Sequence, residues 1–451
     1  MGRLFGTDGA RGVANSEISC ELAANIGRGL AMILEERTGG RPRVLIGRDT
    51  RASGEMLDSA VAAGLCSAGA DVVRLGVVPT PAVAWLVTDC RADAGVMLSA
   101  SHNPAEYNGI KIFGPKGFKL TDDQEFEIED IVLDHSIPYV VKWGGGVGRI
   151  SEDRAAVERY IAHLAKAPTQ SLAGLRVAVD CANGSASATA EKLFGSLGVR
   201  CDLFSHDPDG VNINAGCGST HIDALARRVK EGSYDLGVAF DGDADRCLAV
   251  DEAGRVLDGD KIMAILALYL RRRGCLRGNT VVATVMSNLG FFKFAQQNDM
   301  TACATKVGDR YVLERMLAEG YSIGGEQSGH VIFLDHMPTG DGQLTALLLM
   351  DAVRASGRPL SALAGVMEQY PQVLVNLRAD PSMKAGWQVD EGVSQCIARH
   401  KAKLGENGRI LVRASGTEPL IRVMVEGRDE AEIQAIANDI ADTIRDRLEI
   451  K

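Results

Sequence analysis

Three stretches of the chain repeat one pattern of apolar and polar positions. Each opens with a short β-branched run, continues through a small polar loop and a segment with helical spacing, and ends in a second apolar run. The stretches span residues 43–76, 176–205 and 280–308. In the first, Leu57, Val61 and Leu65 recur at every fourth position, which places them on one helix face. The strand–helix–strand order predicts parallel strands joined by right-handed crossovers.

Three copies of this pattern predict three similar α/β domains in tandem, with mixed or parallel sheets. The last part of the chain differs and predicts a smaller C-terminal α+β domain. Its expected strands are residues 372–379, 409–415 and 421–427, and its expected helices are residues 387–404 and a final helix from Asp429. The fold class is therefore α/β, with expected domains at residues 1–150, 151–254, 255–367 and 368–451.

The composition is that of an ordinary globular protein, since 46% of the 451 residues are apolar and 24% are charged. No segment reaches the ~20 apolar residues of a membrane helix, and the N-terminus lacks a signal-peptide core, so we expect a cytoplasmic protein. The ten scattered cysteines favour reduced thiols. The net charge is −10, and the densest basic cluster, at residues 269–279, is typical of a helix C-terminus. Nucleic acid is therefore a poor candidate partner.

The polar stretch SASHNPAEYNG, at residues 99–109, follows the apolar run AGVML. Asn, Pro and Gly form turns readily, so a plain turn is one interpretation. The other interpretation is a nucleophile at the end of a strand, because ligands of α/β sheets collect at the carboxyl ends of strands. Ser101 lies at that position.

A group of carboxylates lies between two apolar runs in LGVAFDGDADRCLAV. Asp241, Asp243 and Asp245 alternate along the loop and would repel one another unless a cation neutralised them. Oxygen ligands select a hard ion such as Mg²⁺. An EF-hand calcium loop is a rival, because Glu252 stands at the twelfth loop position. However, Arg246 occupies the sixth position, where an EF-hand needs glycine, and the flanks are typical of strands. A solvated acidic turn without metal is the remaining alternative.

Three Asp oxygens leave an octahedral Mg²⁺ short of ligands, and the ion usually takes the others from water and phosphate. The chain contains no Walker A sequence that would bind a nucleotide phosphate. A phosphorylated serine could supply the phosphate, which directs attention to Ser101.

The sequence resembles the α-D-phosphohexomutases. Their four signature loops are matched, in the family's order, by SASHNPAEYNGIKIF at 99–113, DGDADR at 241–246, GEQSGH at 325–330 and RASGTEPLIRV at 413–423. FGTDGARG at residues 5–12 also matches, and with GEQSGH it is most similar to the branch that acts on glucosamine phosphates. The resemblance covers nearly the whole chain.

The resemblance implies a four-domain, heart-shaped enzyme around a central cleft. It implies an isomerase that interconverts glucosamine 6-phosphate and glucosamine 1-phosphate, a step toward UDP-N-acetylglucosamine. Ser101 would be the phosphoserine, and Asp241, Asp243 and Asp245 would bind one Mg²⁺ together with that phosphate. A hexosamine 1,6-bisphosphate would be intermediate and activator. The expected partner is a small phosphosugar, with no nucleic acid or membrane, and a homodimer is compatible with the sequence.

Phosphoryl transfer depends on positioning and charge neutralisation, and the attacking hydroxyl must also lose a proton. Mg²⁺ and Arg246 can supply the positive charge. By motif position, the candidate bases are Lys111, His102, Arg11 and His330, of which Lys111 and Arg11 are favoured. Arginine is a poor base, so holding phosphate is its more natural role. For His102 an orienting hydrogen bond within its own loop is the alternative, and for His330 a structural role.

Two further loops would hold the sugar phosphate. The resemblance implies that Glu326 and Ser328 accept hydrogen bonds from vicinal sugar hydroxyls, although a simple turn between strands would also explain GEQSGH. It also implies that the RASGTEPLIRV loop binds the phosphate that is not being transferred, through guanidinium, hydroxyl and backbone N–H groups. The residues concerned are Arg413, Ser415, Gly416, Thr417 and Arg422. The stretch ATKVGDRYV, at residues 304–312, is a further candidate for sugar orientation.

Other functions are compatible with parts of this pattern. A phosphoglucomutase or phosphomannomutase would use the same chemistry on a different sugar. A phosphatase would result if water took the phosphate, which only a closed cleft prevents. A non-catalytic phosphosugar-binding protein would be expected to lack the serine or the metal carboxylates, and this sequence retains them.

Overall fold

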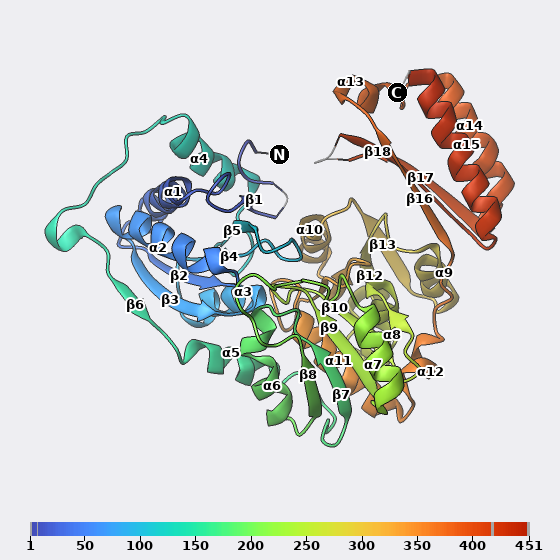
Figure 1. The fold of residues 1–451 in the computed structure, drawn as a ribbon, viewed down its shortest axis with the longest axis horizontal. Helices are drawn as coiled ribbons and strands as arrows, with labels where there is room; N and C mark the ends of the chain where they lie inside the picture. Colours follow the sequence, from blue (N-terminus) through green and yellow to red (C-terminus); the bar gives the residue numbers. More distant parts are fainter. Residues whose placement is uncertain (1, 7, 416–418, 449–451) are drawn as a thin grey trace. The chain divides into compact units, whose positions relative to one another are not determined.

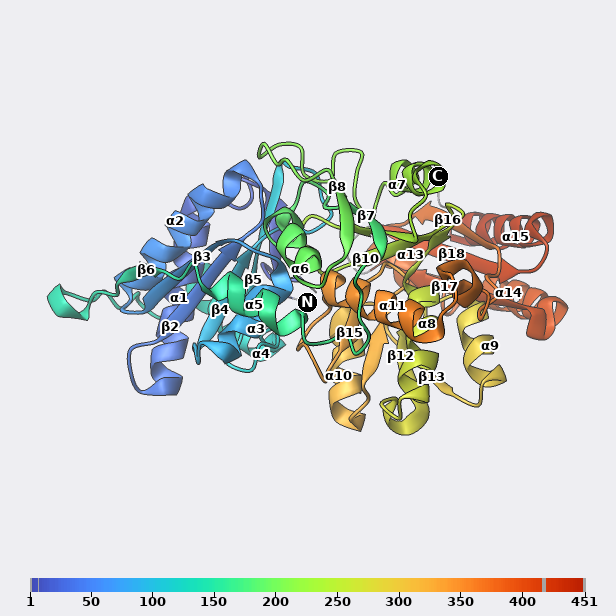
Figure 2. The same ribbon diagram turned by 90° about the horizontal axis from the view of Figure 1, so that it is seen from below.

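The structure, a computed structural model, describes residues 2–6, 8–415 and 419–448 (Figures 1 and 2). The chain divides into two compact units, Met1–Met286 with Met300–Val366, and Ser287–Asp299 with Met367–Lys451. The described residues form sheets of six, five, four and three strands, which confirms the predicted α/β class. The predicted domain limits at residues 150, 254 and 367 stay predictions.

The first sheet has the strand order β1-β5-β4-β2-β3-β6. Strands β2, β3 and β4 are parallel, as the repeated pattern predicts, whereas β5 pairs antiparallel with β4, and β1 pairs antiparallel with β5. Its elements are β1 (Ala10–Val13), α1 (Cys20–Thr38), β2 (Arg43–Arg48), α2 (Ala52–Ser67), β3 (Asp71–Val77), α3 (Thr80–Asp89), β4 (Ala94–Leu98), β5 (Tyr107–Phe113), α4 (Asp122–Leu133), η1 (Gly144–Gly146) and β6 (Ile150–Glu152).

Helices α1, α2 and α4 cover one face of this sheet. Alternate strand residues such as Val44, Ile46 and Val96 share one buried cluster with these helices. α1 and α2 approach closely because Gly64 has no side chain, and a Cβ there would collide with the carbonyl oxygen of Ala24. This core holds β4 and β5 rigidly, and the loop that contains Ser101 connects those two strands.

The second sheet has the order β11-β10-β9-β7-β8, with β7 parallel to both β8 and β9. Its elements are α5 (Ala156–Leu164), β7 (Arg176–Asp180), η2 (Ser185–Ala188), α6 (Ala190–Ser196), β8 (Arg200–Phe204), α7 (Asp223–Gly232), β9 (Leu236–Phe240), β10 (Cys247–Asp251) and β11 (Val256–Leu257). The three aspartates lie in the connection of the antiparallel pair β9–β10. Strands therefore flank the acidic loop, as predicted, and the EF-hand alternative is excluded.

The third sheet has the order β13-β12-β14-β15. Its elements are α8 (Gly259–Arg272), η3 (Arg277–Asn279), β12 (Thr280–Thr284), β13 (Thr301–Thr305), α10 (Asp309–Glu319), β14 (Ile323–Gly325), β15 (Val331–Phe333), α11 (Gly342–Ser356) and α12 (Leu360–Ala364). β12 and β13 are parallel, so the third copy of the pattern is confirmed. Arg271 and Arg272 lie in the last turn of α8, as expected for the basic cluster.

The second unit contains the three-stranded antiparallel sheet β16-β18-β17. Its elements are α9 (Leu289–Gln297), β16 (Gln372–Arg378), α13 (Pro381–Gly386), α14 (Glu391–Leu404), η4 (Gly405–Asn407), β17 (Gly408–Ala414), β18 (Leu420–Gly427) and α15 (Glu430–Leu448). The helix expected from Trp387 begins instead at Glu391, because the side chain of Asp390 accepts a hydrogen bond from the amide of Val393 and caps it.

All ten cysteines are free thiols. Within the described part of the chain, no helix has the length and apolar character needed to cross a membrane.

Candidate active site

Ser101 lies just beyond the carboxyl end of the parallel strand β4. Its backbone has a φ of 51°, in the left-handed region, and its amide donates to Ser99 Oγ at 2.9 Å. The side chain of Ser101 is directed to the acidic loop of the second sheet, where Oγ donates to Asp241 Oδ2 at 2.6 Å. The serine and the carboxylates singled out from separate motifs therefore lie in direct contact.

The three aspartates form a buried cluster. Asp241 and Asp243 are 0% exposed and Asp245 is 5% exposed, and one oxygen of each lies within 4.8 Å of the others. Burial, followed by the charges of Asp245 and Asp243, raises the pKa of Asp241 well above its ordinary value. For Asp245 burial acts in the same direction, but Lys111, His330 and Arg246 together outweigh it and the pKa is lowered. The cluster is thus a concentration of negative charge away from water.

Lys111, on β5, is the positive group at the centre of this cluster. Its ammonium lies 2.8 Å from Asp243 Oδ2, 3.1 Å from Asp8 Oδ2 and 3.7 Å from Asp245 Oδ2. Burial alone would lower the pKa of Lys111, but Asp243 and Asp8 together raise it well above its ordinary value. The residue is therefore held as a cation, with its side chain 1% exposed.

The oxygen atoms of the cluster fit a divalent cation. Asp243 Oδ1 and Asp245 Oδ1 are buried and accept no hydrogen bond from the described residues. The second oxygen of Asp243 is oriented by Thr80, whose Oγ1 donates to it at 2.6 Å. Buried carboxylate oxygens without donors are costly unless a cation binds them, and hard oxygen donors match Mg²⁺.

His102 follows the serine directly, and its Nδ1 lies 3.4 Å from Ser101 Oγ. Burial, together with the positive charges of Arg246 and Arg11, lowers the pKa of His102 to about 4. The imidazole is therefore neutral near pH 7. Its geometry is compatible with both interpretations, an orienting hydrogen bond within the loop and proton transfer.

Two arginines border the same region. The backbone amide of Arg246 donates to Asp241 Oδ1 at 3.2 Å, and its guanidinium Nε lies 3.9 Å from Asp245 Oδ1. Arg11, on β1, forms an ion pair with Asp8. Both guanidinium groups are therefore placed beside carboxylates of the site, where they can offset added negative charge.

The GEQSGH loop connects β14 and β15 and contacts the second sheet. The amide of Cys247 donates to the carbonyl of Gly329 at 3.0 Å, which places this loop against the residue that follows Arg246. Glu326 Oε1 accepts from the amide of Gly308 at 3.1 Å, and Ser328 is exposed.

His330, at the end of that loop, is buried. Its Nδ1 lies 3.5 Å from Asp245 Oδ2, and its Nε2 accepts a hydrogen bond from the amide of Gly340 at 3.2 Å. Nδ1 therefore faces the carboxylate of Asp245. This arrangement favours a structural or orienting role for His330.

Sequence reasoning missed three charged residues of this region. Lys119 forms ion pairs with Asp8 and, at 2.7 Å, with Asp309. One ammonium therefore connects the segment before β1 with the start of α10. Asp8 and Asp309 lie inside the quoted stretches 5–12 and 304–312, but their pairing was not foreseen. No sequence pattern marks Lys119, because a lysine beyond β5 is usually an exposed residue.

The second unit holds the remaining predicted residues. Side chains at 421, 423 and 425 of β18 enter the core with α14 and α15. Arg422 therefore lies on the opposite face of the sheet, where it is directly across from Arg413 of β17. Ser415 is buried at the end of β17, and Gly416 and Thr417 lie outside the described residues.

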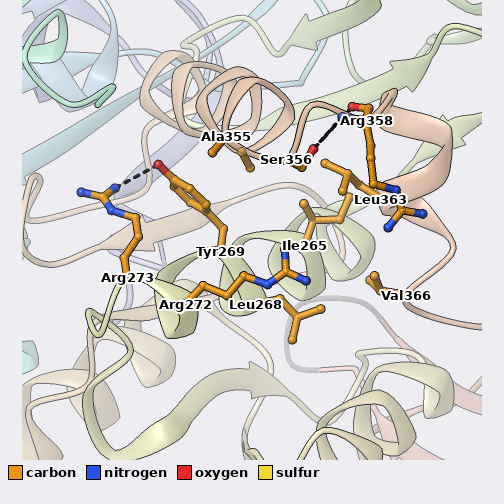
Figure 3. A pocket seen from close by; sticks show the side chains of 11 residues that line it. Ile265, Leu268, Tyr269, Arg272, Arg273, Ala355, Ser356, Arg358, Leu363 and Val366 are labelled. Atoms are coloured by element: carbon orange, nitrogen blue, oxygen red, sulfur yellow. Dashed lines mark hydrogen bonds between the residues drawn. The ribbon is translucent and has the colours of Figure 1, made fainter. Parts of the chain in front are cut away.

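Two other features contain none of the predicted site residues. A cavity of about 200 Å³ lies among α8, α11 and α12, with the side chains of Tyr269, Arg272 and Arg358 at its wall (Figure 3). In the second unit, Cys396, His400 and Asp439 lie within metal-binding distance of one another. However, a guanidinium nitrogen of Arg399 already contacts all three side chains, so an internal cation occupies their centre.

Four family descriptions match the sequence in order. They are phosphoglucomutase/phosphomannomutase alpha/beta/alpha domain I at residues 2–136, domain II at 158–254, domain III at 258–370, and the C-terminal domain at 374–443. Among curated proteins, the chain is 49% identical to a phosphoglucosamine mutase of Acetivibrio thermocellus over 448 residues, 99% of this chain and 100% of that protein. It is 48% identical to a phosphoglucosamine mutase of Brevibacillus brevis, with 99% and 100% covered.

Solved structures show the same fold. A phosphoglucomutase/phosphomannomutase family protein of Burkholderia thailandensis superposes with a TM-score of 0.82 at 24% identity, covering 98% of this chain and 97% of the other. Aspergillus fumigatus N-acetylphosphoglucosamine mutase, in complex with GlcNAc-6P and magnesium, superposes with a TM-score of 0.70 at 18% identity, covering 98% and 95%.

Proposed function

Because this chain belongs to the phosphoglucomutase/phosphomannomutase family, we propose that it is an isomerase that interconverts glucosamine 6-phosphate and glucosamine 1-phosphate. Relatives that share about half of its residues over nearly the full length are named phosphoglucosamine mutase. The observation that carries the proposal is the contact of Ser101 Oγ with Asp241 inside a buried carboxylate cluster. A serine in that place can hold a phosphoryl group beside a cation site.

In the proposed reaction a phosphoryl group is given to the sugar and another is taken back. The free hydroxyl of the sugar monophosphate attacks the phosphorus of phosphoserine 101, so that a phosphorus–oxygen bond to the sugar forms and the bond to Ser101 Oγ breaks. The hydroxyl proton passes to a base and the serine regains a proton. The 1,6-bisphosphate then turns over and returns its other phosphoryl group to Ser101, which completes the isomerisation.

The residues of the cluster fit a resident Mg²⁺, which Asp241, Asp243 and Asp245 would hold together with the phosphoserine. When bound, the ion supplies positive charge to the phosphoryl oxygens. Lys111 keeps the carboxylates in place through its ion pairs with Asp243 and Asp245.

Proton transfer is proposed to involve one of the four candidates that the motifs supply, namely Lys111, His102, Arg11 and His330. His102 Nδ1 lies 3.4 Å from the serine oxygen, whereas Lys111 and Arg11 are engaged with carboxylates. Arg246 is proposed to offset charge that develops on the phosphoryl group.

The sugar and its distal phosphate are proposed to bind through the other two loops. Glu326 and Ser328 would accept hydrogen bonds from sugar hydroxyls, and they come from the loop that contacts β10. Arg413 and Arg422, together with Ser415, Gly416 and Thr417, would bind the phosphate that is not transferred. Their positions support this role, because two guanidinium groups from neighbouring strands can donate to one phosphate dianion.

The substrate assignment is tested by assaying the purified chain on the 6-phosphates of glucosamine, glucose and mannose, with a hexose 1,6-bisphosphate as activator. We expect the highest kcat/KM with glucosamine 6-phosphate. An equal or higher kcat/KM with mannose 6-phosphate would assign the chain to the phosphomannomutase activity, and release of inorganic phosphate alone would indicate a phosphatase.

The phosphoserine is tested by intact-mass spectrometry. The active protein should carry one phosphate, which Ser101→Ala removes together with mutase turnover, since no hydroxyl remains to accept the phosphoryl group. Ser59→Ala, on the exposed side of α2, is the control and should retain both phosphate and turnover. Full turnover by Ser101→Ala would refute the mechanism.

Cation binding is tested with Asp243→Asn. Loss of one buried carboxylate should weaken Mg²⁺ binding, measured by calorimetry, by more than the ~10–100-fold that substitution of an outer partner costs. Turnover should fall as well. Asp251→Asn, at the far end of β10, is the control, because this buried carboxylate bonds Arg255 and takes no part in the cluster. It should keep its Mg²⁺ affinity, and unchanged affinity in Asp243→Asn would exclude the site.

The distal phosphate site is tested with Arg413→Ala. Loss of one charge-assisted contact, about 1.5–3 kcal/mol, should raise KM at least about tenfold for both the 6-phosphate and the 1-phosphate. Most of the effect belongs in KM, because the contact is similar in ground and transition states. The phosphate on Ser101 should remain. Arg399→Ala, on α14 behind the same sheet, is the control, and an unchanged KM in Arg413→Ala would reassign this loop.

A further inference from the structure

Ser101 has an unfavourable backbone conformation that contacts with other parts of the chain must stabilise. Its φ of 51° lies in the left-handed region, which a residue with a Cβ adopts only at a steric cost. A glycine at position 101 would avoid this cost, but the residue is a serine. A strained residue persists only where its surroundings hold it firmly. The contacts of the loop therefore identify the residues that orient Ser101 Oγ toward Asp241.

A buried arginine makes most of these contacts. Arg51, which directly precedes α2, is 1% exposed, and its guanidinium donates to three carbonyl oxygens of the serine loop. Nη2 donates to Ser101 O at 2.9 Å and to Asn103 O at 2.8 Å, and Nη1 donates to Pro104 O at 2.6 Å. Nε donates to Asp49 Oδ2 at 2.9 Å, which neutralises the guanidinium. Only the planar fork of an arginine reaches so many acceptors at once.

The same ion pair also holds the other side of Ser101. Asp49 Oδ2 accepts a hydrogen bond from Ser99 Oγ at 2.6 Å, and Ser99 Oγ accepts one from the amide of Ser101 at 2.9 Å. The amide and the carbonyl of Ser101 are thus both connected to the Arg51–Asp49 pair. This closed set of bonds leaves the serine little freedom to rotate out of its conformation.

The serine loop also accepts hydrogen bonds from the segment that forms the second sheet. Asn214 Nδ2 donates to Ser101 O at 2.9 Å and to Asn103 O at 3.1 Å. The carbonyl of Ser101 also approaches Gly242, where any Cβ would lie 2.6 Å from it. The serine loop is therefore locked against the acidic loop by backbone contacts as well as by Ser101 Oγ.

We infer that Arg51 is a positioning residue, which holds the Ser101 loop in the one conformation that presents Oγ to the carboxylate cluster, with Asn214 as its second support. This inference rests on the proposed function. Among the described residues, the Arg51 guanidinium bonds Asp49 and the serine loop and none of the three cluster aspartates, so it acts through the loop. Displacement of the serine by about 1 Å would cost roughly a hundredfold in rate.

The test compares Arg51→Lys, Asn214→Ala and the control Arg74→Ala. Lysine keeps a positive charge opposite Asp49, whereas alanine would leave that carboxylate buried and unpaired. The three donors of an ammonium cannot replace the planar guanidinium, which bonds Asp49 and three carbonyls at once. Arg74 pairs with Asp58 in the same sheet region and contacts no part of the serine loop. Each variant is assayed well below its melting temperature for kcat, KM and the rate of Ser101 phosphorylation by a 1,6-bisphosphate. Hydrogen exchange of residues 99–109 is measured in parallel.

We expect Arg51→Lys to lose about a hundredfold in kcat and in the rate of serine phosphorylation, with KM nearly unchanged. Asn214→Ala should lose less, and both should exchange faster in residues 99–109. Arg74→Ala should show only a lower melting temperature. Wild-type kcat and wild-type exchange in both loop variants would overturn the inference and leave Arg51 a purely structural residue. If the unmodified chain isomerises no hexose phosphate, the proposed function fails, and the exchange data alone still decide whether Arg51 positions the loop.

Discussion

The charge balance around Lys111 is the constraint on which the site depends. Asp8, Asp243 and Asp245 converge on one buried ammonium, and Asp241 joins them through its contact with the serine. Buried carboxylates at this spacing repel one another, so the fold is stable only if cations are placed among them. Arg11 and Lys119 also pair with Asp8, which leaves Lys111 and Arg246 to offset the three aspartates of the acidic loop. The remaining negative charge is what makes the cluster suitable for a divalent cation and, beside it, a phosphoryl group.

This balance also explains why the site is assembled from several sheets. Lys111 comes from β5, the aspartates come from the β9–β10 connection, and Thr80 at the start of α3 orients Asp243. Lys119 then connects Asp8 with Asp309, at the start of α10. Each pair joins residues far apart in sequence, so no part of the first unit can form the cluster alone. The cost of burying these charges is offset only when the sheets pack together.

Sequence patterns predicted the elements well and the contacts poorly. Apolar periodicity located the parallel strands and the hairpin around the aspartates, because burial on a strand leaves a local signature. The start of α14 was misplaced, since the apolar Trp387 and Val389 extended the helical pattern past the cap at Asp390. Motifs located Ser101 and the aspartates, whereas Lys119 was missed. Its role arises from long-range pairing, which a single sequence does not encode locally.

Arg51 is a second residue whose burial and contacts the sequence did not predict. In sequence it is one charged residue in a polar loop before a helix, for which exposure is the ordinary expectation. In the structure it is buried, and it replaces the backbone partners that the serine loop lacks. A loop that must leave the regular hydrogen bonding of β4 and β5 exposes carbonyls that need donors. Supplying them from one rigid guanidinium, itself fixed by Asp49, converts a flexible turn into a defined support for Ser101.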